Sequence, residues 1–129
     1  VIGGDHSLAA GSVGASADFV AERGGHLGLL WIDAHGDMNT PATTTSGNVH
    51  GMPLALLMNI EKKGKNRPRV FTMDTWDRLR KIGVNGPKLK PSDLVFIGLR
   101  DYEPEEAAII QEYGIKVFTV KDLRERIGG

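Results

Sequence analysis

An α/β fold with helices packed on a mostly parallel sheet is the fold class that the sequence predicts, and two observations lead to it. Mostly apolar runs of strand length occupy residues 26–33, 93–99 and 115–120. Continuous apolar runs of this length are typical of strands that are buried on both faces of a sheet. Segments with helical patterning lie between these runs, and a strand, helix, strand order joins parallel strands through a right-handed crossover.

The first third of the chain reads as a strand end followed by a helix. Residues 1–2 are strand-like and lead into a Gly-Gly turn. The segment after this turn is rich in small residues and has a helical pattern, and Ser7 can cap its first turn. A second helix is predicted at residues 51–60, after a polar loop.

The later part of the chain contains one segment that is hard to assign. Residues 61–91 are polar and punctuated by Gly and Pro, with a short amphipathic piece at 76–82. A helix is predicted at 103–114, because acidic residues occupy its first turn and Gly114 provides a stop. A final helix begins near residue 120.

Composition limits the chain to one globular core and excludes several classes of partner. The sequence has 129 residues, 40% of them hydrophobic, and we expect residues 1–129 to be part of a single domain. Its 16 basic residues balance 16 acidic ones, which argues against a nucleic-acid or membrane partner. Cysteine is absent, so oxygen and nitrogen atoms must hold any metal. No signal peptide or membrane-spanning run is visible, and we expect a soluble, cytoplasmic protein.

Both ends of the sequence indicate an excerpt from a longer chain. The first residue already lies in a strand-like segment and is not Met, and the final helical pattern, with Leu123 and Ile127 four apart, stops without anything to pack on. A parallel sheet that lacks flanking strands exposes apolar edges, so we expect an exposed edge in this chain.

Candidate metal ligands follow the apolar run at 26–33. Asp33, His35 and Asp37 occupy alternate positions, and an extended backbone points alternate side chains to the same side. Ligands of doubly wound sheets bind at the carboxyl ends of the strands, where this triplet lies. His6, in the stretch GGDHS, can reach the same edge if its strand is a neighbour.

The triplet alone allows two interpretations. Polar residues at a turn often cap backbone groups, and a short motif is a hypothesis until its structural context confirms it. However, two carboxylates beside an apolar strand need a positive charge, and no Lys or Arg lies nearby in the sequence. Oxygen and nitrogen ligands in this mixture favour manganese, zinc or iron over calcium.

The loop MNTPATTTSGNVHG, residues 38–51, surrounds one histidine with neutral hydrogen-bonding side chains. Ser, Thr and Asn commonly satisfy their own turns, which is the structural explanation for such a loop. After a strand end with metal ligands, the same groups can hold the polar head of a small substrate while His50 moves protons. Both explanations stay open at this point.

Taken together, GGDHS, WIDAHGDMNTP and TTTSGNVHGMP resemble the arginases of the ureohydrolase family, and VFIGLRDYEPEE resembles a later arginase segment. The resemblance covers nearly the whole chain, and the Thr-Thr-Thr-Ser-Gly-Asn run distinguishes it from agmatinases and formiminoglutamases. It implies a three-layer α/β/α sandwich, assembled as a homotrimer or homohexamer. It also implies the hydrolysis of L-arginine to L-ornithine and urea with two manganese ions (Mn2+).

The resemblance further implies roles for individual residues. His6, Asp33 and Asp37 would ligate one manganese ion. Asp33 would also bridge to a second ion, which His35 binds. The ion pair would lower the pKa of a bridging water, so that hydroxide attacks the guanidinium carbon. His50 would shuttle a proton, and His50 and Asp37 are the candidate catalytic residues. The residues that would bind the α-carboxylate of arginine are Asn39, Thr44, Ser46 and Asn48.

Two departures from the arginase pattern limit this expectation. Arginases take further metal ligands from a later Asp-x-Asp strand and hold the guanidinium group with a later glutamate, and this chain contains neither. We therefore expect this stretch alone to bind manganese weakly and to turn over little substrate. Glu103 stands where arginases commonly have an aspartate near the substrate amino group, and Glu106 matches the following acid, so both are substrate-binding candidates. A ureohydrolase for another guanidino compound and a non-catalytic homologue are the alternatives.

Overall fold

Three parallel strands form one sheet in the computed structural model, which describes residues 2–84 and 86–127. The strands, in chain order, are β1 (Leu29–Ile32), β2 (Leu94–Leu99) and β3 (Lys116–Thr119). β2 lies between the other two, and Phe96 of β2 pairs in register with Trp31 on one side and Val117 on the other. The parallel sheet confirms the predicted α/β class and the three predicted strands, each with shorter bounds.

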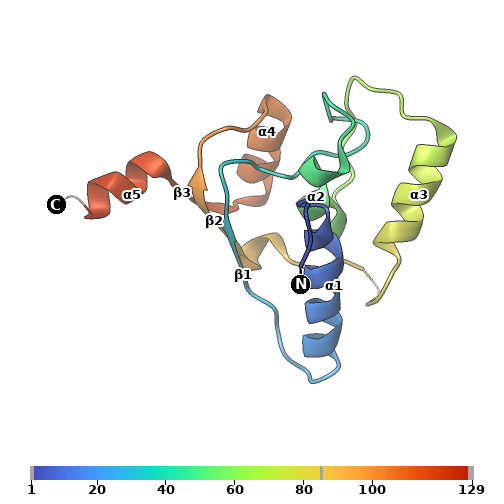
Figure 1. The fold of residues 1–129 in the computed structure, drawn as a ribbon, viewed down its shortest axis with the longest axis horizontal. Coiled ribbons are helices and arrows are strands. Elements are labelled where there is room, and N and C mark those ends of the chain that lie inside the picture. The colour runs from blue at the N-terminus through green and yellow to red at the C-terminus, as the bar shows by residue number, and fades with distance from the viewer. Residues whose placement is uncertain (1, 85, 128–129) are drawn as a thin grey trace.

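Helices fill the segments between and after the strands (Figure 1). In chain order they are α1 (Leu8–Ala21), the 3-10 helix η1 (Val49–Gly51), α2 (Pro53–Leu57), α3 (Val70–Arg80), the 3-10 helix η2 (Pro91–Asp93), α4 (Pro104–Tyr113) and α5 (Val120–Ile127). In Figure 1, α1, α2 and α3 lie together on one side of the strands, and α5 extends away from β3. None of the described helices is both long and apolar enough to cross a membrane.

One hydrophobic core holds α1 to α4 against one face of the sheet. Trp31 and Phe96 belong to this core, and Phe96 is fully buried. Leu54 and Leu57 enter the core from α2, and Ile109 enters it from α4. Full burial of one large apolar side chain contributes about 1.5–3 kcal/mol. This face therefore fixes the position of β1 and of the residues that follow it.

The opposite face of β1 is open to solvent. Leu30 is 64% exposed and Ile32 is 76% exposed. The prediction that this run is buried on both faces is wrong for β1, because no element among the described residues covers these two side chains. The exposed apolar edge that the sequence predicted is confirmed, since β1 has a neighbouring strand on one side only within the described sheet.

The start of the chain differs from the sequence prediction in two respects. Ser7 occupies the N-cap position of α1, but its side chain makes no capping hydrogen bond. Instead, Asp5 Oδ1 accepts a hydrogen bond of 2.7 Å from the backbone N–H of Ser7. Ile2 is not part of a strand, and Val1 lies outside the described residues.

Two helices have other bounds than the sequence predicted. Most of the amphipathic piece at 76–82 belongs to a longer helix, α3, which begins at Val70 and ends at Arg80. The helix predicted at 51–60 is confined to the five residues of α2, because Asn59 adopts a left-handed φ of 56° soon after it. Pro53 at the first position of α2 fits its start, since a missing N–H is harmless there.

Backbone hydrogen bonds join the ends of β1 and β2. The N–H of Asp33 donates to the carbonyl of Ile97 at 3.2 Å, which continues the ladder past β1. The carbonyl of Ala34 accepts hydrogen bonds from the N–H groups of Arg100 and Asp101, at 3.0 and 2.9 Å. The segment that follows β1 is therefore held against the end of β2.

Replacing Gly114 by alanine should lower the free energy of unfolding by about 1 kcal/mol, because Gly114 ends α4 with a left-handed φ of 61° that a Cβ disfavours. The matched change Gly11→Ala should raise the free energy of unfolding by about 0.5–1 kcal/mol, because alanine favours the helix more than glycine does. Gly11 lies inside α1, and an added Cβ meets no neighbouring atom within 4 Å. Urea denaturation of the complete protein measures both. Effects of the same sign would contradict this placement of the two glycines.

Candidate functional site

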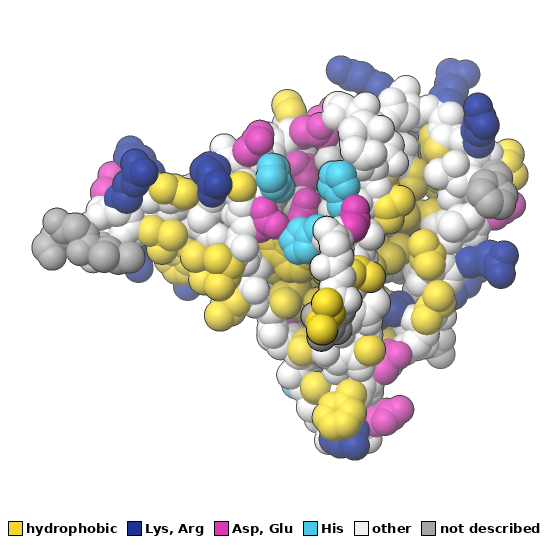
Figure 2. Space-filling view, in the orientation of Figure 1, with side chains coloured by type: hydrophobic (Ala, Val, Ile, Leu, Met, Phe, Trp, Pro, Cys, Tyr) yellow, Lys and Arg dark blue, Asp and Glu magenta, His cyan; other side chains and the backbone are white. Residues whose placement is uncertain are grey.

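Three side chains from two parts of the sequence converge at the carboxyl end of β1. His6 Nδ1 lies 3.2 Å from Asp33 Oδ2 and 2.9 Å from Asp37 Oδ2. One potential ligand atom from each residue lies within 4.8 Å of the other two, so the three can hold a metal ion. Figure 2 shows histidine and acidic side chains gathered near the centre of one face of the molecule.

Different elements position these side chains. Asp33 directly follows β1. Asp37 lies in the irregular segment after it, where its backbone has a left-handed φ of 50° and its carbonyl accepts a hydrogen bond of 3.0 Å from Leu54 N–H. His6 precedes α1, and its ring stacks on Trp31 with the centroids 4.5 Å apart and an interplanar angle of 16°. The sequence predicted that His6 reaches this edge from a strand end, but in the structure it comes from the start of a helix.

The buried carboxylate of Asp37 needs a positive charge nearby. Asp37 is 5% exposed, and its Oδ2 has no hydrogen-bond partner among the described residues, although the imidazole of His6 is close. Burial raises the pKa of Asp37, and the negative charge of Asp33 raises it further. A buried ionised carboxylate is stable only when a cation or hydrogen-bond donors compensate it. The donor set of this site therefore fits a metal cation.

His35 lies beside this group of three. His35 Nδ1 is 3.2 Å from Asp33 Oδ1, whereas His6 approaches the other oxygen, Oδ2. On its far side, His35 Nε2 lies 3.6 Å from Asp101 Oδ2. The two oxygens of Asp33 thus face two different imidazoles, an arrangement that suits a carboxylate shared between two cations.

The four predicted carboxylate-binding residues lie on one loop, residues 38–48, which we call the substrate loop. Asn39 and Thr44 are each 8% exposed, whereas Ser46 and Asn48 lie at the surface. Asn39 Oδ1 accepts a hydrogen bond of 2.9 Å from Thr43 Oγ1, and Ser46 Oγ accepts one of 3.2 Å from the N–H of Asn48. The loop therefore satisfies several of its own turns, and substrate binding by these residues stays a prediction.

His50 lies on η1, and its side chain is 51% exposed. Its Nδ1 is 3.6 Å from Asp5 Oδ2. Hydrogen bonds from Ser7, through its side chain and its backbone, lower the pKa of Asp5. His50 is thus accessible to solvent and lies next to an ionised acid, a position from which an imidazole can exchange protons.

The two glutamates at the start of α4 contact the substrate loop. Glu103 Oε2 accepts a hydrogen bond of 2.8 Å from Asn39 Nδ2, and Glu103 Oε1 accepts one from Thr45 Oγ1. Glu106 is 4% exposed, and its carboxylate accepts hydrogen bonds from the N–H groups of Met38 and Glu103. Burial raises the pKa of Glu106, which these two hydrogen bonds partly offset. A contact of either glutamate with substrate stays a prediction.

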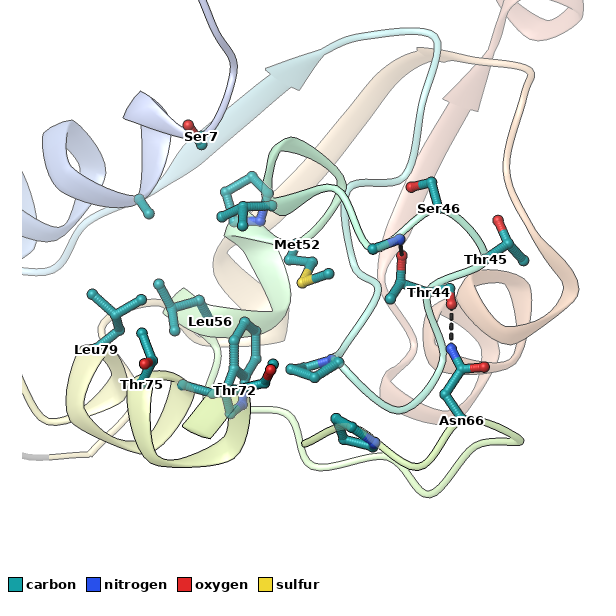
Figure 3. Close-up of a pocket in the computed structure, with 17 residues that line it drawn as sticks. Ser7, Thr44, Thr45, Ser46, Met52, Leu56, Asn66, Thr72, Thr75 and Leu79 are labelled. Atoms are coloured by element: carbon teal, nitrogen blue, oxygen red, sulfur yellow. Dashed lines mark hydrogen bonds between the residues drawn. The ribbon is translucent and has the colours of Figure 1, made fainter. Parts of the chain in front are cut away.

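A cavity of about 500 Å³ lies behind the substrate loop, between the loop, α2 and α3 (Figure 3). Met52, Leu56 and Trp76 give it a largely apolar lining. At its edge, Asn66 Nδ2 donates a hydrogen bond to the carbonyl of Thr44, which holds this side of the loop (Figure 3). The loop thus has one side on the cavity and the other on α4.

Three neighbours of the site were not assigned from the sequence. Asp5 directly precedes His6, and Asp101 lies two residues before Glu103. Their positions beside assigned residues were therefore an available signal. Thr45 had no such signal, because nothing in the Thr-Thr-Thr run separates it from Thr43 and Thr44. Only the fold shows that Thr45 reaches α4.

The fold and the site define an α/β protein with a candidate metal centre at the carboxyl end of a parallel strand. A model of the Arginase family matches residues 1–128, and the chain belongs to this family. It is 43% identical to arginase-1 of Homo sapiens over 99% of its length, and 41% identical to the arginase of Neurospora crassa over 95%. The crystal structure of arginase from Bacillus subtilis matches 98% of the chain with a TM-score of 0.76 at 37% identity.

The chain spans about a third of the length of these relatives. It covers 35% of the human protein, 31% of the Neurospora protein and 37% of the Bacillus chain. Family membership confirms the resemblance that the sequence motifs indicated. The structural match confirms a partial α/β arginase-like fold.

Replacing Asp37 by asparagine should raise the free energy of unfolding of the metal-free protein by about 1 kcal/mol near neutral pH, because no buried carboxylate then ionises. An acid whose pKa is higher in the folded than in the unfolded state lowers stability as the pH rises through that interval. The gain should therefore be largest above the raised pKa of Asp37 and vanish below its ordinary value of 3.8. Denaturant titrations at several pH values measure it.

Asp74→Asn is the matched control, because Asp74 is exposed on α3. Its effect should stay within about 0.5 kcal/mol at every pH. A loss of stability in the Asp37→Asn variant of the metal-free protein near neutral pH would contradict the claim that ionised Asp37 destabilises the fold.

Proposed function

We propose that this chain forms part of the single catalytic domain of a manganese-dependent hydrolase that converts L-arginine to L-ornithine and urea. The observation that carries the proposal is the convergence of His6, Asp33 and Asp37, with one oxygen of Asp37 buried and without a hydrogen bond among the described residues. Family membership supports the reaction, because the relatives are named arginases.

Mn2+ is the proposed cofactor, with two ions in the complete active site. Oxygen and imidazole donors without sulfur suit manganese. His6, Asp33 and Asp37 would hold one ion, and Asp33 would share the second with His35. The approach of two imidazoles to different oxygens of Asp33 supports this sharing. When bound, the ions supply the Lewis acidity that makes water a nucleophile near neutral pH.

The residues of the chain would orient the substrate and move its protons. Water adds to the guanidinium carbon, the bond from this carbon to Nε of arginine breaks, and the leaving amine gains a proton. His50 would shuttle this proton, because its side chain is half exposed and imidazole is the most common general acid and base in enzymes. Asp37 would act through its buried charge, which holds the cation at the end of β1.

Arginine specificity would lie in the substrate loop and at the start of α4. The α-carboxylate of the substrate would be bound by Asn39, Thr44, Ser46 and Asn48. Glu103 and Glu106 would lie near the α-amino group. The alternative is a ureohydrolase for another guanidino compound, and the contacts of Glu103 favour it. Because the Glu103 carboxylate already accepts hydrogen bonds from Asn39 and Thr45, fewer of its lone pairs are free to accept hydrogen bonds from a substrate amino group.

We also propose a cytoplasmic homotrimer or homohexamer without a nucleic-acid or membrane partner. The balance of 16 basic and 16 acidic residues supports the absence of a polyanionic partner. The exposed side chains of Leu30 and Ile32 support further burial of this face in the assembled protein.

Urea release from L-arginine by the complete protein, with and without added manganese, tests the proposed function. We expect manganese-dependent release that Asp33→Asn lowers by at least about a hundredfold, because the variant loses the carboxylate shared by both ions. The Asp74→Asn variant should keep wild-type activity, since Asp74 is exposed on α3.

Agmatine and guanidinobutyrate serve as comparison substrates in the same assay. Hydrolysis of one of these and not of arginine would favour the alternative ureohydrolase. No hydrolysis by a folded, manganese-loaded wild-type protein would indicate a non-catalytic homologue and would overturn the proposal.

A further inference from the structure

The side chains at the start of α4 cap the helix and also contact the substrate loop. Glu103 and Glu106 form a capping box, in which Glu103 N–H donates to Glu106 Oε2 at 2.9 Å. A capping box needs these side chains only for the free N–H groups of the helix. In this chain each carboxylate also accepts a hydrogen bond from the substrate loop.

Glu106 fixes the point where the loop begins. Its Oε1 accepts a hydrogen bond of 3.0 Å from the N–H of Met38, which is fully buried. The backbone of Gly36 lies so close that an added Cβ would be 2.8 Å from the same oxygen. A side chain at position 36 would therefore displace the Glu106 carboxylate from its present position.

Glu103 connects two separate points of the loop. Its Oε2 accepts a hydrogen bond of 2.8 Å from Asn39 Nδ2, near the start of the loop. Its Oε1 accepts a hydrogen bond from Thr45 Oγ1, in the middle of the loop. Hydrogen bonds to an ionised carboxylate are stronger than those between neutral groups. One carboxylate thus restrains the loop at two points, in addition to the hydrogen bond from Asn66.

We propose that Thr45 and Glu103 form a positioning pair that fixes the substrate loop and thereby sets the affinity for the carboxylate end of the substrate. Thr45 is exposed, and its chain neighbours Thr44 and Ser46 are predicted to bind that carboxylate. The pair acts through these neighbours and contacts no reacting atom. The inference rests on the proposed function, because it describes how the same site binds its substrate.

The test is a Thr45→Val variant of the complete, manganese-loaded protein, which loses the hydroxyl and keeps the shape of the side chain. The KM for L-arginine should rise about fivefold, the effect of one lost hydrogen bond, while kcat stays within about twofold. The inhibition constant of L-ornithine, which has the same carboxylate end, should rise in parallel. Thr45→Ser should restore wild-type values, since it retains the hydroxyl.

Thr72→Val is the matched control, because Thr72 lies on α3 across the cavity from the loop. This variant should leave KM unchanged. The thermal midpoint with manganese should be the same in the wild type and in the Thr45 variants, so that a general loss of stability cannot explain a change in KM.

An unchanged or lower KM in Thr45→Val would overturn the positioning pair and would favour a direct contact of Glu103 with the substrate. If the wild-type protein releases urea, this result leaves the proposed function intact. If the wild type releases no urea, the proposed function fails, and calorimetric titration of L-ornithine decides the inference instead. Weaker binding to Thr45→Val supports the pair, and equal or absent binding overturns it.

Discussion

The electrostatic interaction of two carboxylates with one imidazole at the carboxyl end of β1 is the constraint on which the site depends. Asp33 and Asp37 both face His6, and Asp37 does so from a buried position. The negative charge of Asp33 disfavours ionisation of Asp37, and one imidazole supplies at most a single positive charge. A bound cation removes this conflict, because it compensates both acids. The arrangement is costly without a metal and favourable with one.

The rest of the fold holds these charges in place. The core under β1 and the hydrogen bonds at Ala34 fix the segment that carries the acids. Glu106 adds a second buried acid beneath the loop, and the charge of Asp37 contributes to its raised pKa. The candidate metal centre and the substrate loop therefore share one electrostatic environment. A cation held at Asp37 would favour ionisation of Glu106 and would strengthen the hydrogen bond that this carboxylate accepts from the loop.

The sequence predicted the elements whose signals are local. Apolar runs located the three strands, and Gly114 marked the end of α4 with the expected left-handed conformation. The alternate spacing of Asp33, His35 and Asp37 predicted metal-type ligands at a strand end, but the extended backbone behind that prediction is wrong, because β1 ends at Ile32, residues 34–35 bend and Asp37 has a left-handed φ of 50°. The approach of His6 to Asp33 and Asp37 was expected from the resemblance, but other contacts between distant segments were out of reach, because no local pattern encodes them. The stacking of His6 on Trp31 and the hydrogen bond from Thr45 to α4 both depend on the folded packing.

The most direct test of this account is anomalous X-ray diffraction from crystals of the complete protein loaded with manganese. The account predicts one manganese peak bound by His6, Asp33 and Asp37, and a second peak that shares Asp33 with His35. A structure in which His6 contacts both carboxylates directly and no manganese lies between them, at a concentration that saturates the protein in solution, would contradict it.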